Sequence, residues 1–143
     1  DSPLTETIFM KPEITLDSNV LIYAFSSQDD LKKVTAKRLL LECKKVSIQA
    51  INETLYVLLR KFNFEVSELY KVQKFFREKF IVTVMDTDLL SRSLEILDKY
   101  SYSYWDSMML AAAIVNNCDI IYSEDMQNKQ IIEGKLEIIN PFL

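Results

Sequence analysis

The sequence has no histidine, and this absence excludes more chemistry than any other feature of its composition. Serine–histidine–aspartate triads, cysteine–histidine pairs and histidine-based ribonuclease chemistry all need an imidazole. Most transition-metal sites also use a histidine nitrogen as a ligand. Any catalysis by this chain must therefore come from carboxylates, lysine, tyrosine, cysteine, serine or a hard metal ion.

Cysteine, glycine and long apolar runs are scarce as well. The two cysteines, Cys43 and Cys118, sit in apolar surroundings and form no Cys-x-x-Cys motif, so we interpret both as inert core residues. A single glycine and three prolines leave no flexible linker. No apolar run approaches the roughly 20 residues that cross a bilayer, and no basic-then-apolar signal pattern opens the chain. We expect a reduced, cytoplasmic protein without membrane association.

The chain also lacks a dense basic face. Its 17 basic and 21 acidic residues give a net charge of −4, and the basic pairs are scattered along the sequence. A protein that grips nucleic acid by neutralising phosphates alone needs more concentrated positive charge. We therefore interpret most of the lysines and arginines as solvated helix faces.

Short apolar runs alternate with helical patterns, which is typical of βαβ units around a parallel sheet. With 143 residues, 49% of them hydrophobic, the chain has the length for one domain with a sizeable core. We expect strands at 14–16, 46–49, 80–85, 120–122 and 136–139. We expect helices at 18–25, 29–45, 51–62, 67–79, 87–99 and 104–116. The sequence thus predicts an α/β fold, a three-layer α/β/α sandwich with a short, mostly parallel central sheet of four or five strands.

The first residues are polar and irregular. We therefore divide the chain into an irregular N-terminal extension at 1–9 and a single domain at 10–143, with Met10 as a candidate for the native start. No internal repeat or low-complexity tract subdivides the domain further.

Four carboxylates follow the predicted strands or begin the helices after them. Asp17 follows the first strand directly, and Asp125 follows the strand at 120–122. Glu53 and Asp106 fall in the first turns of two predicted helices. Ligands of open parallel sheets bind beyond the carboxyl ends of the strands, so all four acids can reach one edge. Clustered carboxylates repel one another unless cations lie between them, and oxygen-only ligands suit Mg²⁺ or Mn²⁺.

We therefore predict a Mg²⁺ or Mn²⁺ site at this edge of the sheet. Two such ions would clamp a phosphodiester, with one activating water and the other stabilising the leaving oxygen. Their charge of about +4 would offset four carboxylates and explain how an acidic protein approaches a polyanion.

Each acid also has a simpler interpretation. Asp17 and Asp125 are also candidates for turn or cap residues. Glu53 and Asp106 are also candidates for solvated first-turn acids, which the helix dipole favours. Glu124 competes with Asp125 for the same role, and we favour Asp125.

Other polar and aromatic residues near these acids leave two interpretations open. Asp86 and Asp88 also follow a strand, and we interpret them as a capping pair for the next helix. Asn19 and Ser123 either orient the carboxylates or simply form turns. An aromatic group precedes Asp106; it could stack bases, but we favour packing in the core or in a dimer. Its members are Tyr100, Tyr102, Tyr104 and Trp105.

Four segments of the chain resemble the PIN-domain family, and within it the VapC-type toxins of type II toxin–antitoxin systems. The segments are ITLDSNVLIYAF, INETLYVLL, YWDSMMLAAAI and IIYSEDMQNKQIIEGKLEIINPF. The resemblance runs from about Glu13 to the C-terminus. It implies a PIN-like α/β/α fold and a Mg²⁺- or Mn²⁺-dependent endoribonuclease, in which metal-activated water hydrolyses RNA phosphodiesters. It also implies a cognate antitoxin protein and a homodimer.

The resemblance assigns roles residue by residue. The metal-binding and catalytic acids of the family match Asp17, Glu53, Asp106 and Asp125. Its supporting polar residues match Asn19 and Ser123.

Two other functions remain as alternatives at this point. In the first, a catalytically silent PIN-like module holds a partner's arginines through the acidic cluster. In the second, a receiver domain is phosphorylated at Asp86, but no lysine directly follows the segment IIYSED, and Lys129 lies further on. We favour the endoribonuclease.

Overall fold

The structure, a computed structural model, describes residues 11–143. The predicted extension at 1–9 and the candidate start at Met10 lie outside these described residues. The elements are, in order, β1 (Ile14–Leu16), α2 (Ser18–Phe25), α3 (Asp30–Glu42), β2 (Lys45–Ser47), α4 (Ile48–Lys61), α5 (Val66–Lys79), β3 (Ile81–Thr83), α6 (Thr87–Tyr100), α7 (Tyr104–Val115), β4 (Ile120–Tyr122), β5 (Ile131–Ile132) and β6 (Leu136–Ile139).

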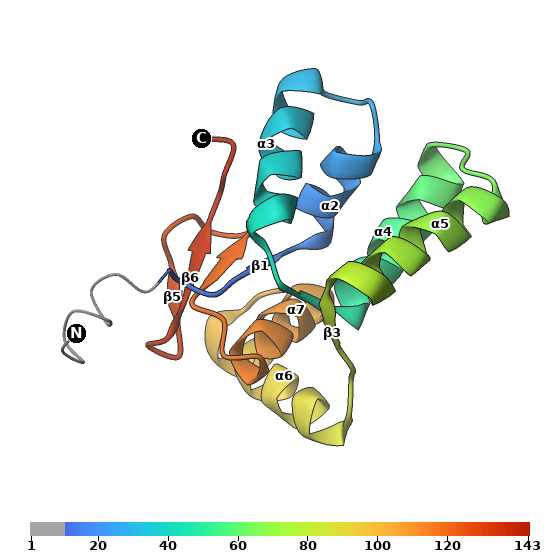
Figure 1. Cartoon of the computed structure of the whole chain (residues 1–143). Helices are drawn as coiled ribbons and strands as arrows, with labels where there is room; N and C mark the ends of the chain where they lie inside the picture. The colour runs from blue at the N-terminus through green and yellow to red at the C-terminus, as the bar shows by residue number, and fades with distance from the viewer. Residues whose placement is uncertain (1–10) are drawn as a thin grey trace, which may run out of the picture.

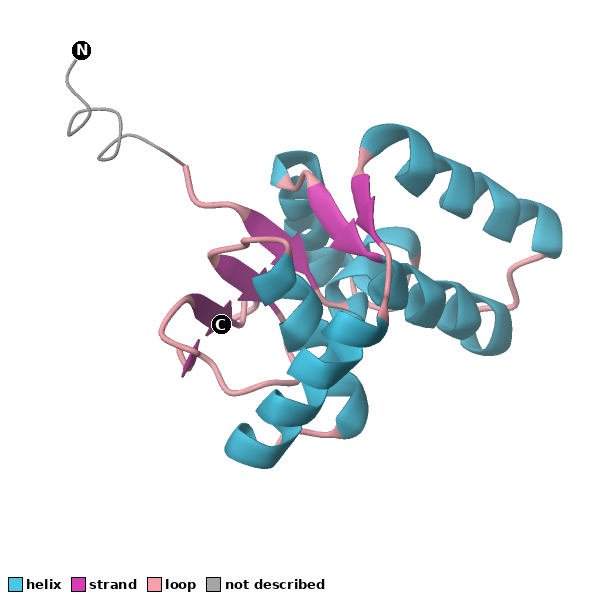
Figure 2. Ribbon diagram, turned by 90° about the horizontal axis from the view of Figure 1, so that it is seen from below, coloured by secondary structure: helices cyan, strands magenta, loops and turns pink. Residues whose placement is uncertain are grey.

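The main sheet has four strands in the order β1-β4-β6-β5. β1 pairs with β4, and β4 with β6, in parallel, while β5 is antiparallel to β6. β2 and β3 form a separate parallel pair beside β1 (Figure 2). Between β1 and β2 a side chain supplies a link, because the Thr15 hydroxyl donates to the carbonyl of Lys45 at 2.8 Å. The mixed α/β fold with a mostly parallel central sheet is thereby confirmed.

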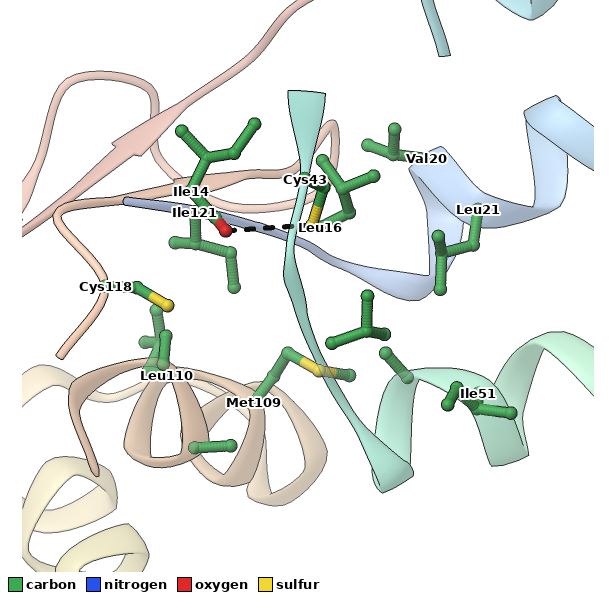
Figure 3. Packing of buried hydrophobic residues seen from close by; sticks show 14 of the residues in the cluster. Ile14, Leu16, Val20, Leu21, Cys43, Ile51, Met109, Leu110, Cys118 and Ile121 are labelled. Atoms are coloured by element: carbon green, nitrogen blue, oxygen red, sulfur yellow. Dashed lines mark hydrogen bonds between the residues drawn. The ribbon is translucent and has the colours of Figure 1, made fainter. Parts of the chain in front are cut away.

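Helices lie on both sides of the sheet, with α2 and α3 on one side of β1 and α6 and α7 on the other (Figure 1). The core lies between these layers. Leu16 of β1 and Ile121 of β4 meet Leu21 of α2 and Leu110 of α7 there (Figure 3). Burying each such side chain contributes about 1.5–3 kcal/mol. Within residues 11–143, no helix combines the length and apolarity needed to cross a bilayer.

Both cysteines belong to this core, as the sequence predicts. Cys43 and Cys118 are buried and free, and the Cys43 thiol donates to the carbonyl of Ile14 at 3.7 Å (Figure 3). Burial raises the pKa of the Cys43 thiol to about 12 and that of Cys118 to about 11. Neither thiol is therefore a nucleophile at neutral pH.

The boundary between β2 and α4 differs from the prediction and changes the position of one candidate site residue. Ser47 ends β2 and caps α4, since its hydroxyl accepts the N–H of Ala50 at 3.0 Å. The helix therefore begins at Ile48 rather than at residue 51. Glu53 consequently lies in the second turn, and its predicted place in the first turn was wrong. A first-turn helix-dipole role for Glu53 is thereby excluded.

The structure also adds a strand that the sequence pattern does not reveal. β5 has only two residues and reverses into β6 through a tight turn. Glu133 and Gly134 occupy this turn with φ of 53° and 64°, and the N–H of Lys135 donates to the carbonyl of Ile132 at 3.0 Å. Two successive residues with positive φ define a type I′ turn, so the only glycine of the chain stands where such a residue is favoured.

Candidate active site

The parallel pairing of β1 with β4 brings two distant segments together at the carboxyl edge of the sheet. Leu16 is the register partner of Tyr122, and the N–H of Asp17 donates to the carbonyl of Tyr122 at 3.0 Å. The next residues along the two strands, Asp17 and Ser123, therefore lie side by side. This is the edge at which open parallel sheets bind their ligands.

Asp17 is a buried carboxylate, only 3% exposed, with both oxygens in hydrogen bonds. Its Oδ1 accepts the N–H of Ser18 at 2.7 Å, which makes Asp17 the N-cap of α2. Its Oδ2 accepts the hydroxyl of Ser123 at 2.8 Å and the amide of Asn19 at 3.1 Å. The capping interpretation is therefore correct for one oxygen. It does not explain why Asp17 is buried or why its Oδ2 is hydrogen-bonded, because an N-cap residue requires neither.

Burial raises the pKa of Asp17 from 3.8 to about 6. The hydrogen bonds from Ser123 and Ser18 lower this pKa, while the negative charges of Asp106 and Asp125 raise it. The cost of burying the charge thus outweighs the hydrogen bonds that stabilise it. A cation beside Asp17 would reverse that balance.

Asn19 connects the acids to each other. Its side-chain Nδ2 lies 3.1 Å from Asp17 Oδ2, 3.2 Å from Ser123 Oγ and 3.1 Å from Asp125 Oδ2. Its Oδ1 accepts the N–H of Glu124 at 3.1 Å. An amide has two hydrogens for these three acceptors, so they share its donors. Asn19 and Ser123 therefore both contact the carboxylates rather than serving only as turn residues.

Glu53 faces the same acids from α4. Its Oε2 is buried and has no hydrogen-bond partner among residues 11–143. The pKa of Glu53 is raised to about 7, first by burial and then by the charges of Asp17 and Asp106, while the neighbouring Gln49 side chain lowers it. A buried carboxylate oxygen without a donor is costly, and a cation is the partner that would remove this cost.

Asp106 lies in the first turn of α7, as predicted. Ser103 caps this helix, since its hydroxyl accepts the N–H of Asp106 at 3.1 Å. Burial raises the pKa of Asp106, the contact with Ser103 lowers it, and the charge of Asp125 raises it. Asp106 is half-buried, which is a different environment from that of a solvated first-turn acid.

The structure separates Asp125 from its competitor Glu124. Asp125 accepts the Asn19 amide and lies on the same side as the other acids. Glu124 instead forms an ion pair with Lys32 of α3 and accepts the hydroxyl of Tyr23 at 2.7 Å. Asp86, in turn, caps α6 by accepting the N–H of Leu89 at 2.9 Å, which confirms the capping interpretation.

Oxygen is the only donor type that these four acids offer. Within the described part of the chain, no three of its carboxylates and thiols lie close enough together to form a ready-made metal cage. The chemistry of the set nevertheless fits Mg²⁺ or Mn²⁺, which prefer carboxylate oxygens and retain water ligands between them. The raised pKa values and the unpartnered Glu53 Oε2 point to the same kind of ligand.

The aromatic group before Asp106 divides into two pairs. The hydroxyls of Tyr100 and Tyr102 accept backbone N–H groups of Glu133 at 2.8 Å and Gln127 at 3.2 Å, so these two rings support the segment after β4. Tyr104 and Trp105 are exposed instead. Packing within the chain is thus confirmed for the first pair, while packing in a dimer stays a prediction for the second.

Three residues near the site were missed at the level of sequence. Gln49, Asn52 and Tyr56 lie on α4 and, with Glu53 and Trp105, line one cavity. Helical periodicity could have found Gln49 and Tyr56, because residues four before and three after Glu53 share its face, but it does not single out Asn52, which directly precedes Glu53.

The fold and the site together define an α/β protein with an acidic centre at the carboxyl edge of its sheet. The chain belongs to the PIN domain family, whose family model matches residues 14–131.

Solved structures of this family superpose on most of the chain. VapC20 of Mycobacterium tuberculosis, described as a sarcin–ricin loop cleaving toxin, is 20% identical, covers 79% of this chain and 90% of its own, and has a TM-score of 0.66. A toxin–antitoxin complex from Klebsiella pneumoniae is 17% identical, with coverages of 90% and 98% and a TM-score of 0.67. DNA-bound VapBC from Salmonella typhimurium is 16% identical, with coverages of 90% and 98% and a TM-score of 0.63. At these identities the likeness establishes the fold. A comparison with curated proteins gives no match.

Proposed function

We propose that the protein is a metal-dependent endoribonuclease that acts as the toxin of a toxin–antitoxin pair. In this proposal residues 10–143 form one nuclease domain that hydrolyses RNA phosphodiesters with Mg²⁺ or Mn²⁺. The observation that carries the proposal is Asp17, a carboxylate 3% exposed that faces the charges of two further acids. Membership of the PIN domain family and the toxins among its structural neighbours support it.

Asp17, Glu53, Asp106 and Asp125 would hold the cation. When bound, a divalent ion supplies an activated water and neutralises charge on the phosphate that is attacked. Asn19 keeps Asp17 Oδ2 and Asp125 Oδ2 on either side of one amide. That amide therefore orients two of the proposed ligands at once.

The carboxyl groups of the proposed site bind protons as well as cations. With pKa values raised to about 6 and about 7, Asp17 and Glu53 hold protons for part of the time near neutral pH. A cation must displace those protons, so its binding releases protons and strengthens as the pH rises. The negative cluster then becomes compatible with a phosphodiester, which four free carboxylates would repel.

A cognate antitoxin and a second copy of the chain are the protein partners that we propose. The structural neighbours include toxin–antitoxin complexes. In this chain an apolar groove of about 210 Å³ lies between α4 and α5, lined by Leu55, Val66, Leu69 and Tyr70. Apolar side chains of α3, Leu31 among them, are also exposed. Such surface is costly in water, and partner proteins would cover it.

A silent binding module is the second candidate, because the carboxylates are spaced more widely than in a formed cage. In that case the acids would hold arginines of a partner, without hydrolysis. Cleavage of RNA separates the two functions directly.

The test is incubation of total cellular RNA with the wild type and with Asp106→Asn, in Mn²⁺ and in EDTA. We expect discrete fragments only from the wild type in Mn²⁺, with the new ends mapped by sequencing. Equal cleavage in EDTA would remove the metal mechanism. Absence of cleavage by a folded, Mn²⁺-binding wild type would favour the binding module.

A further inference from the structure

A cavity adjoins the acidic centre on the side of α4 and has no role in the function proposed above. Its volume is about 470 Å³, within the range of about 300–1,000 Å³ that small-molecule sites occupy. Glu53 forms part of its wall and also faces Asp17 and Asp106. A ligand in this cavity would therefore lie directly beside the carboxylates.

Helical spacing explains why these particular side chains meet. Gln49 lies three and four residues before Asn52 and Glu53, and Tyr56 lies four and three residues after them, so these side chains lie on one side of the helix. Trp105 completes the wall from the first turn of α7 and immediately precedes Asp106. The cavity and the acidic centre thus share residues of α4 and α7, and Ser18, next to Asp17, also lines the cavity.

Two exposed aromatic rings dominate the wall. Tyr56 is 63% and Trp105 56% exposed, so both rings are accessible to a ligand in the cavity. The ring of Tyr104 packs edge-on against Trp105, with centroids 5.2 Å apart and an interplanar angle of 83°. That contact restrains the indole without burying it.

The other wall groups decide which kind of ligand fits. Among residues 11–143, no lysine or arginine lines the wall, and the Glu53 carboxyl group forms part of it. A phosphate would therefore find no positive charge there and one negative group. A flat, uncharged ring with polar edges fits better, since aromatic faces stack on it and the amides of Gln49 and Asn52 hydrogen-bond its edges.

We propose that this cavity is a nucleobase pocket, which takes one unpaired base of the RNA whose backbone passes the acidic centre. The inference rests on the proposed nuclease function for the identity of the RNA. The pocket itself is argued from Tyr56, Trp105 and the uncharged amides beside them. In this proposal, the protein selects a single-stranded RNA site by stacking a base in the pocket, and the scattered basic residues of the chain do not make that selection.

The experiment uses the single tryptophan of the chain as the reporter. Its indole N–H gives one cross-peak in a ¹⁵N–¹H spectrum of the whole protein. Adenosine, guanosine, cytidine and uridine are titrated in EDTA, with ribose as the control without a base. We expect at least one nucleoside to shift the cross-peak saturably and ribose to leave it in place. No shift with any nucleoside would overturn the pocket, as would an equal shift with ribose.

Matched variants then locate the binding. Tyr56→Ala should weaken nucleoside affinity about 5- to 150-fold, the loss expected for one stacking partner, and Tyr56→Phe should restore it. Leu94→Ala is the control, because Leu94 is similarly exposed at 53% but lies on α6 outside the cavity. Equal affinity in Tyr56→Ala and the wild type would overturn the proposal.

Two further measurements separate this inference from the proposed function. Asp17→Asn should lose RNA cleavage yet keep nucleoside binding, because Asp17 does not line the cavity. Nucleoside binding by a wild type that cleaves no RNA would support the pocket and count against the nuclease. If Tyr56→Ala cleaves RNA with an unchanged KM, the result would support the nuclease and count against the pocket. A cross-peak that moves with N-acetyltryptophanamide but with no nucleoside would overturn the pocket in favour of a protein side chain.

Discussion

The hydroxyl of Ser123 donates to Asp17 Oδ2 at 2.8 Å, across a sequence separation of 106 residues. The bond exists because β1 and β4 pair in parallel with Leu16 opposite Tyr122. Ser123 is fully buried, so no water competes with it for the carboxylate. This hydrogen bond lowers the pKa of Asp17 and opposes the larger effect of burial.

Replacing Ser123 by alanine should weaken the metal site without removing a ligand. The pKa of Asp17 rises when the hydroxyl is lost, so protons compete better with the cation. We expect Mn²⁺ affinity at pH 7 to fall about 10- to 100-fold in Ser123→Ala, measured by calorimetry. Ser107→Ala is the matched control, since Ser107 is equally buried and its hydroxyl has no partner within residues 11–143. A similar loss in both variants would contradict the assigned role.

Asp17→Asn should abolish Mn²⁺ binding and leave the fold intact. Asparagine caps a helix about as well as aspartate, so α2 keeps its N-cap. Removing a buried negative charge also relieves repulsion from Asp106 and Asp125. In EDTA at pH 8 we expect the melting temperature of Asp17→Asn to equal or exceed that of the wild type. Asp88→Asn, at an exposed position in α6, is the control. A markedly lower melting temperature in Asp17→Asn would contradict this account.

Stability in EDTA should fall as the pH rises through the range of these raised pKa values. Folding raises the pKa of Asp17 from 3.8 to about 6, so the folded state binds more protons than the unfolded state in that interval. The contribution is fully present below pH 3.8 and is lost above pH 6, and Glu53 extends the loss to about pH 7. For Asp17 alone it is on the order of 3 kcal/mol. Urea unfolding at pH 5 and pH 8 measures the part of this loss that falls between those pH values, and Mn²⁺ at pH 8 should restore stability. Constant stability in EDTA would argue against these shifts.

Removing the charge of Asp125 should lower Mn²⁺ affinity, whereas removing that of its neighbour Glu124 should not. Asp125→Asn removes a proposed ligand and should lower Mn²⁺ affinity about 10-fold or more. Glu124→Gln removes the ion pair with Lys32 and should leave Mn²⁺ affinity nearly unchanged. Calorimetry on the two variants side by side decides between the acids. The converse result would transfer the metal role to Glu124.

Gly134→Ala should destabilise the protein although no atom crowds the position. A Cβ at Gly134 would meet nothing within 4 Å, but its φ of 64° is unfavourable for residues with side chains. We expect a loss of about 1–2 kcal/mol in urea unfolding. Lys135→Ala, at the next and exposed position, is the control. An unchanged midpoint for Gly134→Ala would show that the turn relaxes.

Much of the fold was predictable because buried strands are short apolar runs that end at polar residues. The bounds of β1 and β4 agree with the predictions for this reason. The acids were predicted from the carboxyl edge that these two strands define. β5 was missed because two residues are too few for a periodic pattern. Its pairing with β6 depends on the turn, in which Glu133 has a positive φ. The start of α4 was misplaced because Ser47 both ends a strand and caps a helix.

Residues of the candidate site were predictable only where their position in the sequence, relative to a strand, determines where they lie. Acids that follow a strand within a few residues lie near its edge wherever the strand lies, as Asp17 and Asp125 show. Partners that depend on packing were not accessible in this way. The ion pair of Lys32 with Glu124 joins α3 to the segment after β4, and the cavity joins Tyr56 to Trp105. Such pairs follow from the packing of helices, which a pattern along one helix does not contain.

The pairing of β1 with β4 also sets the order of events on the ribosome. At about 5–20 residues per second, the segment that carries Ser123 is synthesised some 5–20 s after Asp17. During that interval β1 has no parallel partner, and Asp17 stands without the serine that later contacts it. The acidic centre is therefore completed only after β4 has been synthesised, so a nascent chain that stops before Ser123 lacks the contact that joins Asp17 to the segment after β4.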